Sequence, residues 1–495
     1  MELRLCSRLL ISGSRFLRPA AAISTQRCRQ LSSGSSEPAA AAVDEHYDVV
    51  VAGGGMVGFA LACALGQSSR LSELRILLLE SSKQKPALPG FPTSWQSTPY
   101  SNRVSAIANH SVALLDRLGA WQDITAVRVG RVKKMQVWES ESDAHISFGS
   151  GGSSDDGKCV AHIVENDVLL EALRRRLPPT VQVRYGSRAE SYSLPSSAEQ
   201  DAVLHLQDGS VISTSLLVGC DGAESLVRRT MGGRFVSWDY KRMGVVATLE
   251  LEQSEDEENN TAWQKFLPGG PIAILPLCRG QSSLVWSTTP SHAKALLAMD
   301  PQQFTDAINN TLWCDDSSKQ SPWLRDLHQN CSDAVRQVGN FVSKVAAAAP
   351  VGVSYKQLPP SVVAVADNSR AAFPLGLGHA VQYTAPRVVL VGDAAHRVHP
   401  LAGQGVNLGF GDVAALTRVL EETVLEGDDI GNVRQLYRYE TERQRQNVVM
   451  MAAVDGLHRL YATTFPPAVF LRSVGLTAVD AFKPIKNCIQ SYVEG

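Results

Sequence analysis

Three glycines at fixed spacing, Gly53-x-Gly55-x-x-Gly58, and an acid further along, Glu80, have the clearest chemical meaning in this chain. The first glycine permits a sharp turn, the second lets a diphosphate approach the backbone, and the third allows a helix to pack closely on a sheet. The N-terminus of that helix offers unpaired N–H groups and a positive dipole end to an anion. Glu80 lies 25 positions after Gly55, where a carboxylate accepts hydrogen bonds from ribose hydroxyls. The pattern predicts a dinucleotide site, but it does not distinguish FAD from NAD.

Two further motifs favour FAD. One is an apolar run that ends in Asp221-Gly222, and the other extends from Val391 to Gly409. In the longer motif an apolar segment delivers Asp393 to a position where its carboxylate suits a ribityl hydroxyl. The glycine-rich turn that follows opens a helix, whose N–H groups favour negative charge on a reduced flavin ring. An ordinary βα turn with incidental glycines is the alternative. The candidate cofactor-binding residues of this motif are Asp393, Pro400, Gly403, Gln404, Gly405 and Asn407.

Two histidines of the same motif, His396 and His399, raise the question of a metal site. No cysteines or acids at suitable spacing accompany them, so we expect no bound metal. Each histidine is compatible with proton transfer or with a structural role. No Ser-His-Asp or Cys-His arrangement stands out, and we assign no catalytic side chain, because in flavin chemistry the cofactor carries the difficult step.

Short apolar runs and helical periodicity surround the first motif. Residues 47–52 and 74–80 have the pattern of buried parallel strands, and residues 57–67 have that of the helix between them. Together they predict a βαβ unit that holds the glycine turn. Residues 387–391 predict another buried strand, whereas residues 140–158 are rich in Ser, Gly and Asp and predict an exposed loop.

The middle and the end of the chain have other patterns. From residue 235 to 369, alternating segments such as Val245–Leu249 predict antiparallel sheet. Residues 432–460 predict a long helix that ends before a pair of prolines. Residues 468–493 have many apolar residues and a mostly helical pattern.

The composition narrows the class of protein. A chain of 495 residues with 44% hydrophobic residues predicts two globular domains, or one large domain with an inserted sheet. The formal net charge of -2 gives no indication of a nucleic-acid partner. Nine cysteines without a Cys-x-x-Cys pair argue against structural zinc and fit a reducing compartment. No uninterrupted apolar run has the length that a transmembrane helix needs.

The N-terminal segment differs from the rest. Residues 1–36 contain six arginines and many serines and alanines, with Glu2 as the only acid. This composition predicts a mitochondrial transit peptide, and a disordered tail is the alternative. We exclude the segment from the fold.

The three motifs together resemble those of the class A FAD-dependent aromatic hydroxylases, which have the para-hydroxybenzoate hydroxylase fold. The long third motif and the Arg-rich leader are most similar to those of the flavin monooxygenases of mitochondrial ubiquinone biosynthesis. The resemblance, from about Tyr47 to the C-terminus, implies an α/β fold: a doubly wound, Rossmann-like FAD-binding domain with an antiparallel β-sheet substrate domain and C-terminal helices. The implied parts are the transit peptide (1–36), the FAD-binding domain in two parts (47–234 and 370–425), the substrate domain (235–369) and a C-terminal helical region (426–495).

The resemblance also implies roles for individual residues. Asp221-Gly222 belongs to the motif that touches FAD and, in nicotinamide-using relatives, the reductant. Asp393 is expected to bind the ribityl chain, and residues 403–405 the isoalloxazine ring. Arg103 matches an arginine near the flavin diphosphate and ring, although a surface salt bridge is the alternative. Asn166 opens a helix, and its side chain has two alternative roles, contact with the cofactor or N-cap of that helix.

The implied reaction is hydroxylation at ring carbon five of a polyprenylated 4-hydroxybenzoate intermediate, through a flavin C4a-hydroperoxide. The protein's part is to exclude water and to hold the ring in place. The electrons come from NADPH or from ferredoxin and its reductase, and the sequence leaves this choice open. The implied partners are the polyprenylated phenol, molecular oxygen and other ubiquinone-biosynthesis proteins in a complex. Another FAD oxidoreductase on the same fold, or a flavin-stabilised scaffold subunit, is the alternative.

The implied location is the matrix side of the mitochondrial inner membrane, with the protein bound peripherally. We expect the apolar segments of the middle domain and Phe373-Pro374-Leu375 to line a hydrophobic channel for the prenyl tail. Residues 470–493 are compatible with docking on a membrane surface or with packing as a core helix.

Overall fold

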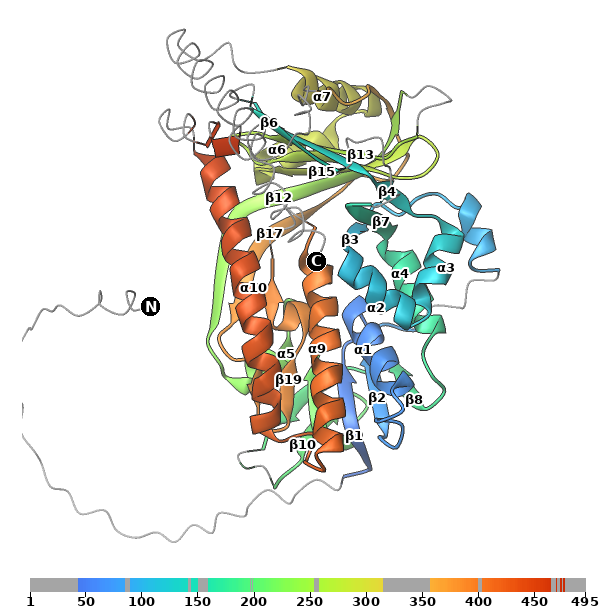
Figure 1. Ribbon diagram of the computed structural model, residues 1–495, viewed down its shortest axis with the longest axis vertical. Helices are drawn as coiled ribbons and strands as arrows, with labels where there is room; N and C mark the ends of the chain where they lie inside the picture. The colour runs from blue at the N-terminus through green and yellow to red at the C-terminus, as the bar shows by residue number, and fades with distance from the viewer. Residues whose placement is uncertain are drawn as a thin grey trace, which may run out of the picture. The chain divides into compact units, whose positions relative to one another are not determined.

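The computed structural model (Figure 1) describes most of the chain after residue 42. The transit-peptide prediction, His399, Pro400 and most of residues 470–493 lie outside the described residues. Those described are 43–84, 90–140, 144–149, 159–195, 197, 199–252, 258–314, 357–398 and 403–463, with Val469, Arg472, Ser473, Gly475 and Leu476.

An eight-stranded sheet has β1 (Glu45–Ala52) at its centre. Two parallel neighbours flank it, β2 (Ile76–Glu80) and β11 (Val211–Gly219). These strands are rich in Val, Leu and Ile and almost fully buried, as expected of parallel strands that are covered on both faces. The remaining strands are β8 (Val181–Tyr185), β9 (Ala189–Ser193), β10 (Ala202–Leu206), β18 (Thr384–Ala385) and β19 (Val388–Leu390).

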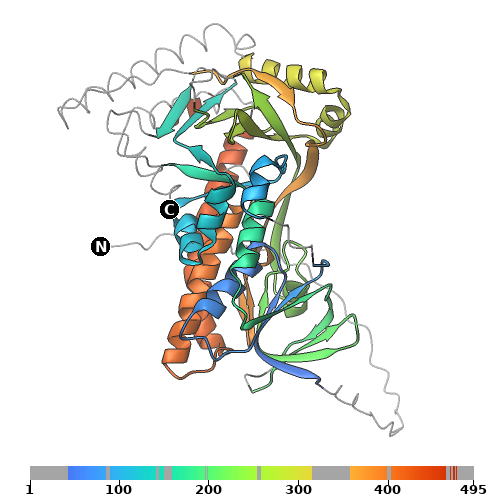
Figure 2. The ribbon, with the colours of Figure 1, turned by 90° about the vertical axis from the view of Figure 1, so that its right-hand side faces the viewer.

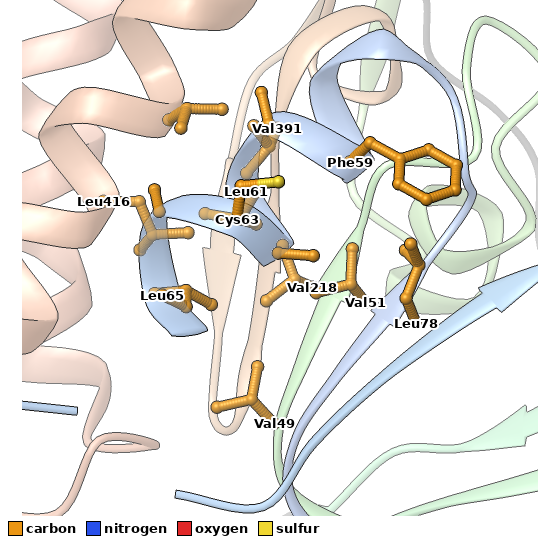
Figure 3. Close-up of a cluster of buried hydrophobic side chains, with 14 of the residues drawn as sticks. Val49, Val51, Phe59, Leu61, Cys63, Leu65, Leu78, Val218, Val391 and Leu416 are labelled. Carbon is orange, nitrogen blue, oxygen red and sulfur yellow. The ribbon is translucent and has the colours of Figure 1, made fainter. Parts of the chain in front are cut away.

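Helix α1 (Met56–Gln67) follows β1 through the glycine turn, and its residues 58–65 are buried. The predicted βαβ unit is therefore confirmed. Burial of each large apolar side chain contributes about 1.5–3 kcal/mol, which fixes the helix on the sheet. Figure 3 shows part of this core, in which α1 meets neighbouring strands and α9: Phe59, Leu61, Cys63, Leu65, Val49, Val51, Leu78, Val218, Val391 and Leu416.

A nine-stranded sheet draws on three separate parts of the chain. Its longest strand, β12 (Phe235–Leu251), pairs antiparallel with β15 (Gln281–Thr288) and β17 (Ala371–Ala380). In contrast, β5 (Lys134–Glu139) and β13 (Thr261–Phe266) pair with each other in parallel. The predicted loop 140–158 is wrong at residues 145–149, which form β6. The other strands are β6 (His145–Gly149), β14 (Ile272–Pro276), β16 (Val362–Val365) and β20 (His396–Arg397).

A small three-stranded sheet and the helices complete the described fold. In the small sheet β7 (Ala161–Glu165) lies between β3 (Val104–Ile107) and β4 (Gly130–Val132). The remaining helices are α2 (Asn109–Arg117), α3 (Ala120–Val127), α4 (Asn166–Arg175), α5 (Leu226–Met231), α6 (Pro290–Ala298), α7 (Pro301–Trp313), α9 (Gly405–Leu425) and α10 (Val433–Ala462).

The two last helices pack against each other. Figures 1 and 2 show α9 and α10 side by side, and α9 also contacts α1. The predicted helix over 432–460 is confirmed by α10, which starts and ends within two residues of that range. Across the described residues, every helix falls short of the combined length and hydrophobicity that a bilayer crossing requires. The expected α/β architecture with a helix near the C-terminus is thus present.

Candidate functional site

The turn after β1 requires glycine at two positions. Gly53 has a φ of +112°, and an added Cβ there would lie 2.4 Å from the carbonyl oxygen of Cys220. At Gly58 an added Cβ would lie 1.9 Å from the carbonyl oxygen of Gly53. The first contact places the first motif directly against the second, which contains Cys220.

Two other glycines face open space at helix N-termini. An added Cβ at Gly55, the N-cap of α1, meets no atom within 4 Å, and the same is true of Gly405, the first residue of α9. Neither helix has a side-chain hydrogen bond at its N-cap, so within the described residues backbone N–H groups of both first turns are available to a ligand. Unpaired N–H groups beside open space fit a diphosphate at α1 and a flavin ring at α9.

Glu80 is held at the glycine turn by backbone donors. Its Oε2 accepts a hydrogen bond from Gly54 N at 2.9 Å, and its Oε1 accepts one from Ser82 N at 2.6 Å. Oε1 also accepts from the Ser81 hydroxyl at 3.5 Å, whereas Gly54 N is the one donor to Oε2 among the described residues. A carboxylate oxygen has about two lone-pair positions, so Oε2 can accept a further hydrogen bond. The position and the remaining acceptor capacity fit ribose hydroxyls.

Asp221 caps a helix with one oxygen and leaves the other without a partner. Its Oδ2 accepts from Leu226 N at 2.7 Å and from Val227 N at 3.2 Å, which holds the start of α5. Its Oδ1 is buried and has no hydrogen-bond partner among the described residues. Buried polar atoms are normally paired, so this oxygen indicates a missing donor. Next to it, Gly222 has a φ of +79° and open space beside its Cα.

Arg228 connects the second motif to the third. Its guanidinium donates to the carbonyl oxygen of Ala223 at 2.6 Å and to that of Ala394 at 2.8 Å. The neighbouring Asp393 is exposed. Desolvation raises the pKa of its carboxyl group, and the charge of His396 opposes this shift. The link fixes the backbone on both sides of the predicted ribityl site.

A buried ionic cluster lies behind Asp393. Asp412, in α9, accepts hydrogen bonds from Gly392 N at 2.9 Å, from His396 Nε2 at 2.6 Å and from Arg443 Nε at 2.7 Å. Desolvation opposes ionisation, but the charges and hydrogen bonds of His396 and Arg443 dominate and lower the pKa of Asp412 to about 2. His396 is therefore a structural residue in this fold, fully buried against a carboxylate. The cluster joins the Asp393 turn to α9 and α10.

The third motif also docks on β3, which starts directly after Arg103. Gly403 has a φ of +63°, and an added Cβ there would lie 3.0 Å from Cβ of Ala106. Asn407 donates to the carbonyl oxygen of Ala106 at 2.8 Å and accepts from Ala108 N at 3.0 Å. Asn407 is almost completely buried, so it positions the turn, and its neighbour Gln404 is buried as well.

Arg103 and Asn166 both lie next to β3, and Asn166 N donates to the carbonyl oxygen of Arg103 at 3.0 Å. The Arg103 side chain is exposed, and its guanidinium forms no hydrogen bond or ion pair within the part of the chain that the structure describes. The surface salt bridge considered for Arg103 is therefore not formed with any described residue. Asn166 begins α4, and its Oδ1 accepts from the hydroxyl of Ser105 at 2.7 Å.

The tertiary structure thus brings together the glycine turn, Asp221-Gly222, Asp393 and the Gly403–Asn407 turn, while Pro400 lies outside the described residues. Sequence reasoning missed Asp412 and Arg443. An acid within an otherwise apolar helical run, residues 408–416, was the available signal for Asp412. Arg443 has no comparable signal, because it lies 31 positions further on in an ordinary polar helix.

Comparisons with known proteins agree with this geometry. A family model described as "FAD binding domain" matches residues 46–336 and 362–454. Two curated relatives, both named "Ubiquinone biosynthesis monooxygenase COQ6, mitochondrial", are from Xenopus tropicalis and Homo sapiens. The Xenopus protein is 47% identical over 90% of this chain and 93% of its own length. The human protein is 46% identical over 91% and 93%.

Solved structures share the fold at lower identity. Pseudomonas aeruginosa PqsL in complex with 2-aminobenzoylacetate has a TM-score of 0.61 at 21% identity, covering 87% of this chain and 99% of its own. The p-nitrophenol 4-monooxygenase PnpA from Pseudomonas putida has a TM-score of 0.63 at 15% identity, covering 92% and 99%. The family match over most of the chain, together with these relatives, makes FAD the cofactor. The chain belongs to the mitochondrial ubiquinone biosynthesis monooxygenases, which are FAD-dependent aromatic hydroxylases of class A.

Proposed function

We propose that this FAD monooxygenase hydroxylates ring carbon five of a polyprenylated 4-hydroxybenzoate intermediate on the path to ubiquinone. The pairing of β20 with β17 carries the proposal. His396 and Arg397, which directly follow the Asp393 turn, pair with His379 and Gly378 of β17. The nine-stranded sheet therefore begins at the predicted flavin site.

β17 continues from that point into an apolar surface. Phe373, Pro374 and Leu375 pair with residues 242–244 of β12, and the ring of Phe373 lies beside Gly244. Apolar side chains of this kind suit an aromatic ring with an apolar tail, since they offer contact area. We assign this stretch of β17 and β12 to the wall that holds the substrate ring.

The three motifs, and the geometry of those of their residues that the structure describes, support a set of cofactor-binding residues. We propose that Gly53, Gly55, Gly58 and the start of α1 bind the diphosphate and that Glu80 binds the adenosine ribose. Asp221 and Gly222, with Asp393, are proposed for the ribityl side. The corresponding residues at the ring are Arg103, Pro400, Gly403, Gln404, Gly405 and Asn407.

FAD, when bound, supplies the electrons and activates the oxygen for the hydroxylation. The protein binds the cofactor and the substrate, orients the substrate ring and excludes water. With FAD bound, the N-terminus of α9 would direct its positive dipole end toward negative charge that develops on the ring system. The cluster of Asp412, His396 and Arg443 fixes the turn that carries Asp393. Such preorganised groups are effective because they need no rearrangement during the reaction.

The electron donor and the location are further parts of the proposal. The sequence contains one dinucleotide motif, so we propose that NADPH binds only transiently, or that ferredoxin and its reductase supply the electrons. A substrate with a prenyl tail resides in the lipid phase, so we place the protein peripherally on the matrix side of the inner membrane, with other ubiquinone-biosynthesis proteins.

One experiment tests the reaction and the donor together. The FAD-loaded protein is reduced anaerobically with NADPH or with ferredoxin and its reductase, then mixed with ¹⁸O₂ and a prenylated 4-hydroxybenzoate. We expect one donor to reduce the flavin and one ¹⁸O atom to appear on ring carbon five, as mass spectrometry and NMR report. Reduction without product would favour another oxidoreductase, and a flavin that neither donor reduces would favour a scaffold. Labelling at a different ring carbon would refute the assigned regiochemistry.

A further inference from the structure

The exposed side of α10 changes character halfway along the helix. Between residues 434 and 445 the exposed positions are polar or mixed, as is usual for a helix on the surface of a globular protein. From residue 448 onward they are apolar or small, and Arg459 is the exception. This apolar face consists of Val448, Val449, Ala452, Ala453, Leu457 and Leu460.

Strand β12 extends the apolar face sideways. Figure 1 shows the strand running alongside α10, and three contacts join them. The hydroxyl of Tyr240 donates to Asp455 at 2.8 Å, the Tyr240 ring lies 4.4 Å from that of His458, and Arg459 lies 4.7 Å above the ring of Trp238. Trp238 is nevertheless 53% exposed. We call the six α10 residues together with Val236 and Trp238 the α10 face.

Charged groups around the α10 face have a positive balance. Three cations and two anions adjoin it among the described residues, so the local charge is +1, whereas the whole chain has a formal charge of -2. Arg242 and His458 line one small cavity with Phe266 and Tyr461, which places this cation at the end of the helix. These five charged residues are Lys241, Arg242, Arg459, Asp239 and Asp455.

We propose that the α10 face docks the protein on the surface of an anionic lipid bilayer. Proteins are held at a membrane interface by features of this kind: a tryptophan beside an arginine, an apolar helix face and surrounding positive charge. Each basic residue near an anionic leaflet adds attraction. The inference rests on the proposed lipid-tailed substrate, which needs a route out of the bilayer, and it assigns that contact to residues before the C-terminal segment 470–493.

Vesicle sedimentation of the FAD-loaded full chain tests the proposal without turnover, so its failure is distinct from failure of the proposed reaction. We expect the wild-type protein to sediment with vesicles of phosphatidylcholine and cardiolipin. Val449→Glu and Leu457→Glu should each weaken binding about tenfold, because they remove apolar contact and add negative charge. The matched control is Leu425→Glu, since Leu425 is the more exposed residue, at 63%, and lies at the end of α9. All variants keep the same Arg-rich N-terminus.

Tryptophan emission gives a second measurement. Vesicles should shift the emission of the wild-type protein to the blue, and Trp238→Phe should remove most of that shift. Equal binding of the α10-face variants and the wild type would overturn the proposal, as would an equal loss in Leu425→Glu. A vesicle-free dimer that Leu457→Glu converts to a monomer would assign the face to a second copy instead. Binding only after removal of residues 477–495 would assign it to that segment.

Discussion

Replacement of Asp412 by asparagine should destabilise both the fold and the FAD site. The carboxylate accepts hydrogen bonds from Gly392 N, His396 and Arg443 at 2.6–2.9 Å, and the side chain is completely buried. Asn is nearly the same size but has no charge. The substitution therefore leaves the guanidinium of Arg443, itself only about 5% exposed, without its counter-ion.

The magnitude follows from the burial. Breaking a buried ion pair by neutralising one partner costs about 3–5 kcal/mol. A domain is stable by about 5–15 kcal/mol, so Asp412→Asn should lower the unfolding midpoint strongly without abolishing the fold. FAD affinity should fall as well, because Gly392, whose N–H loses its carboxylate acceptor, adjoins Asp393. A double variant with Arg443→Met removes the uncompensated charge and should recover part of the lost stability.

The pH dependence has a defined sign. The pKa of Asp412 is lowered to about 2, so its stabilising contribution is present above the ordinary carboxyl pKa of about 4. It is lost as pH falls from about 4 toward 2. The wild-type protein should therefore lose more stability than Asp412→Asn over this interval, and the two unfolding curves should converge.

Urea unfolding of the FAD-loaded protein, followed by circular dichroism, measures the stability, and flavin fluorescence titration measures the affinity. The control is Asp123→Asn, which removes an equally short 2.7 Å contact with Arg176 at a partly exposed site. Exposed pairs contribute about 0–1 kcal/mol, so this control should change little. If Asp412→Asn cost no more than the control and bound FAD as tightly as the wild type, the assigned role of the cluster would be refuted.

Further predictions concern the glycine turn, the cofactor and the thiols. Gly55→Ala should leave the unfolding of the apoprotein almost unchanged yet weaken FAD binding in a fluorescence titration, because its Cβ enters open space. Gly58→Ala should destabilise the apoprotein itself, since its Cβ would lie 1.9 Å from a carbonyl oxygen. Arg103→Ala should weaken FAD binding about ten- to a hundredfold by the same titration, as expected for loss of a charge-assisted hydrogen bond, with little change in apoprotein stability. Iodoacetamide at neutral pH should label the exposed Cys314 before Cys63, whose pKa burial raises to about 12, as peptide mass spectrometry can report.

Much of the fold is determined locally and was therefore predictable. The strands β1 and β2, helix α1 and helix α10 follow from apolar periodicity and from glycine and proline positions, which act over a few residues. β6 was not predicted, because Ser and Gly dominate residues 140–158 and obscure the alternation within His145–Gly149. That strand forms because β5 provides its hydrogen-bonding partner.

By itself, the sequence specified the glycine turn, the acid after β2, the aspartates of the second and third motifs and the resemblance to the class A hydroxylases. These features depend on spacing within one segment. Only the tertiary structure decided which distant groups meet. Asp412, in α9, accepts hydrogen bonds from Gly392 and His396 of the third motif and from Arg443 of α10. In the same way, β20 pairs with β17. Such contacts depend on how complete elements pack, and no spacing rule within a segment encodes them. The same is true of the α10 face. In the sequence its apolar residues resemble the buried stripe of a core helix, and only the tertiary structure shows that they are exposed.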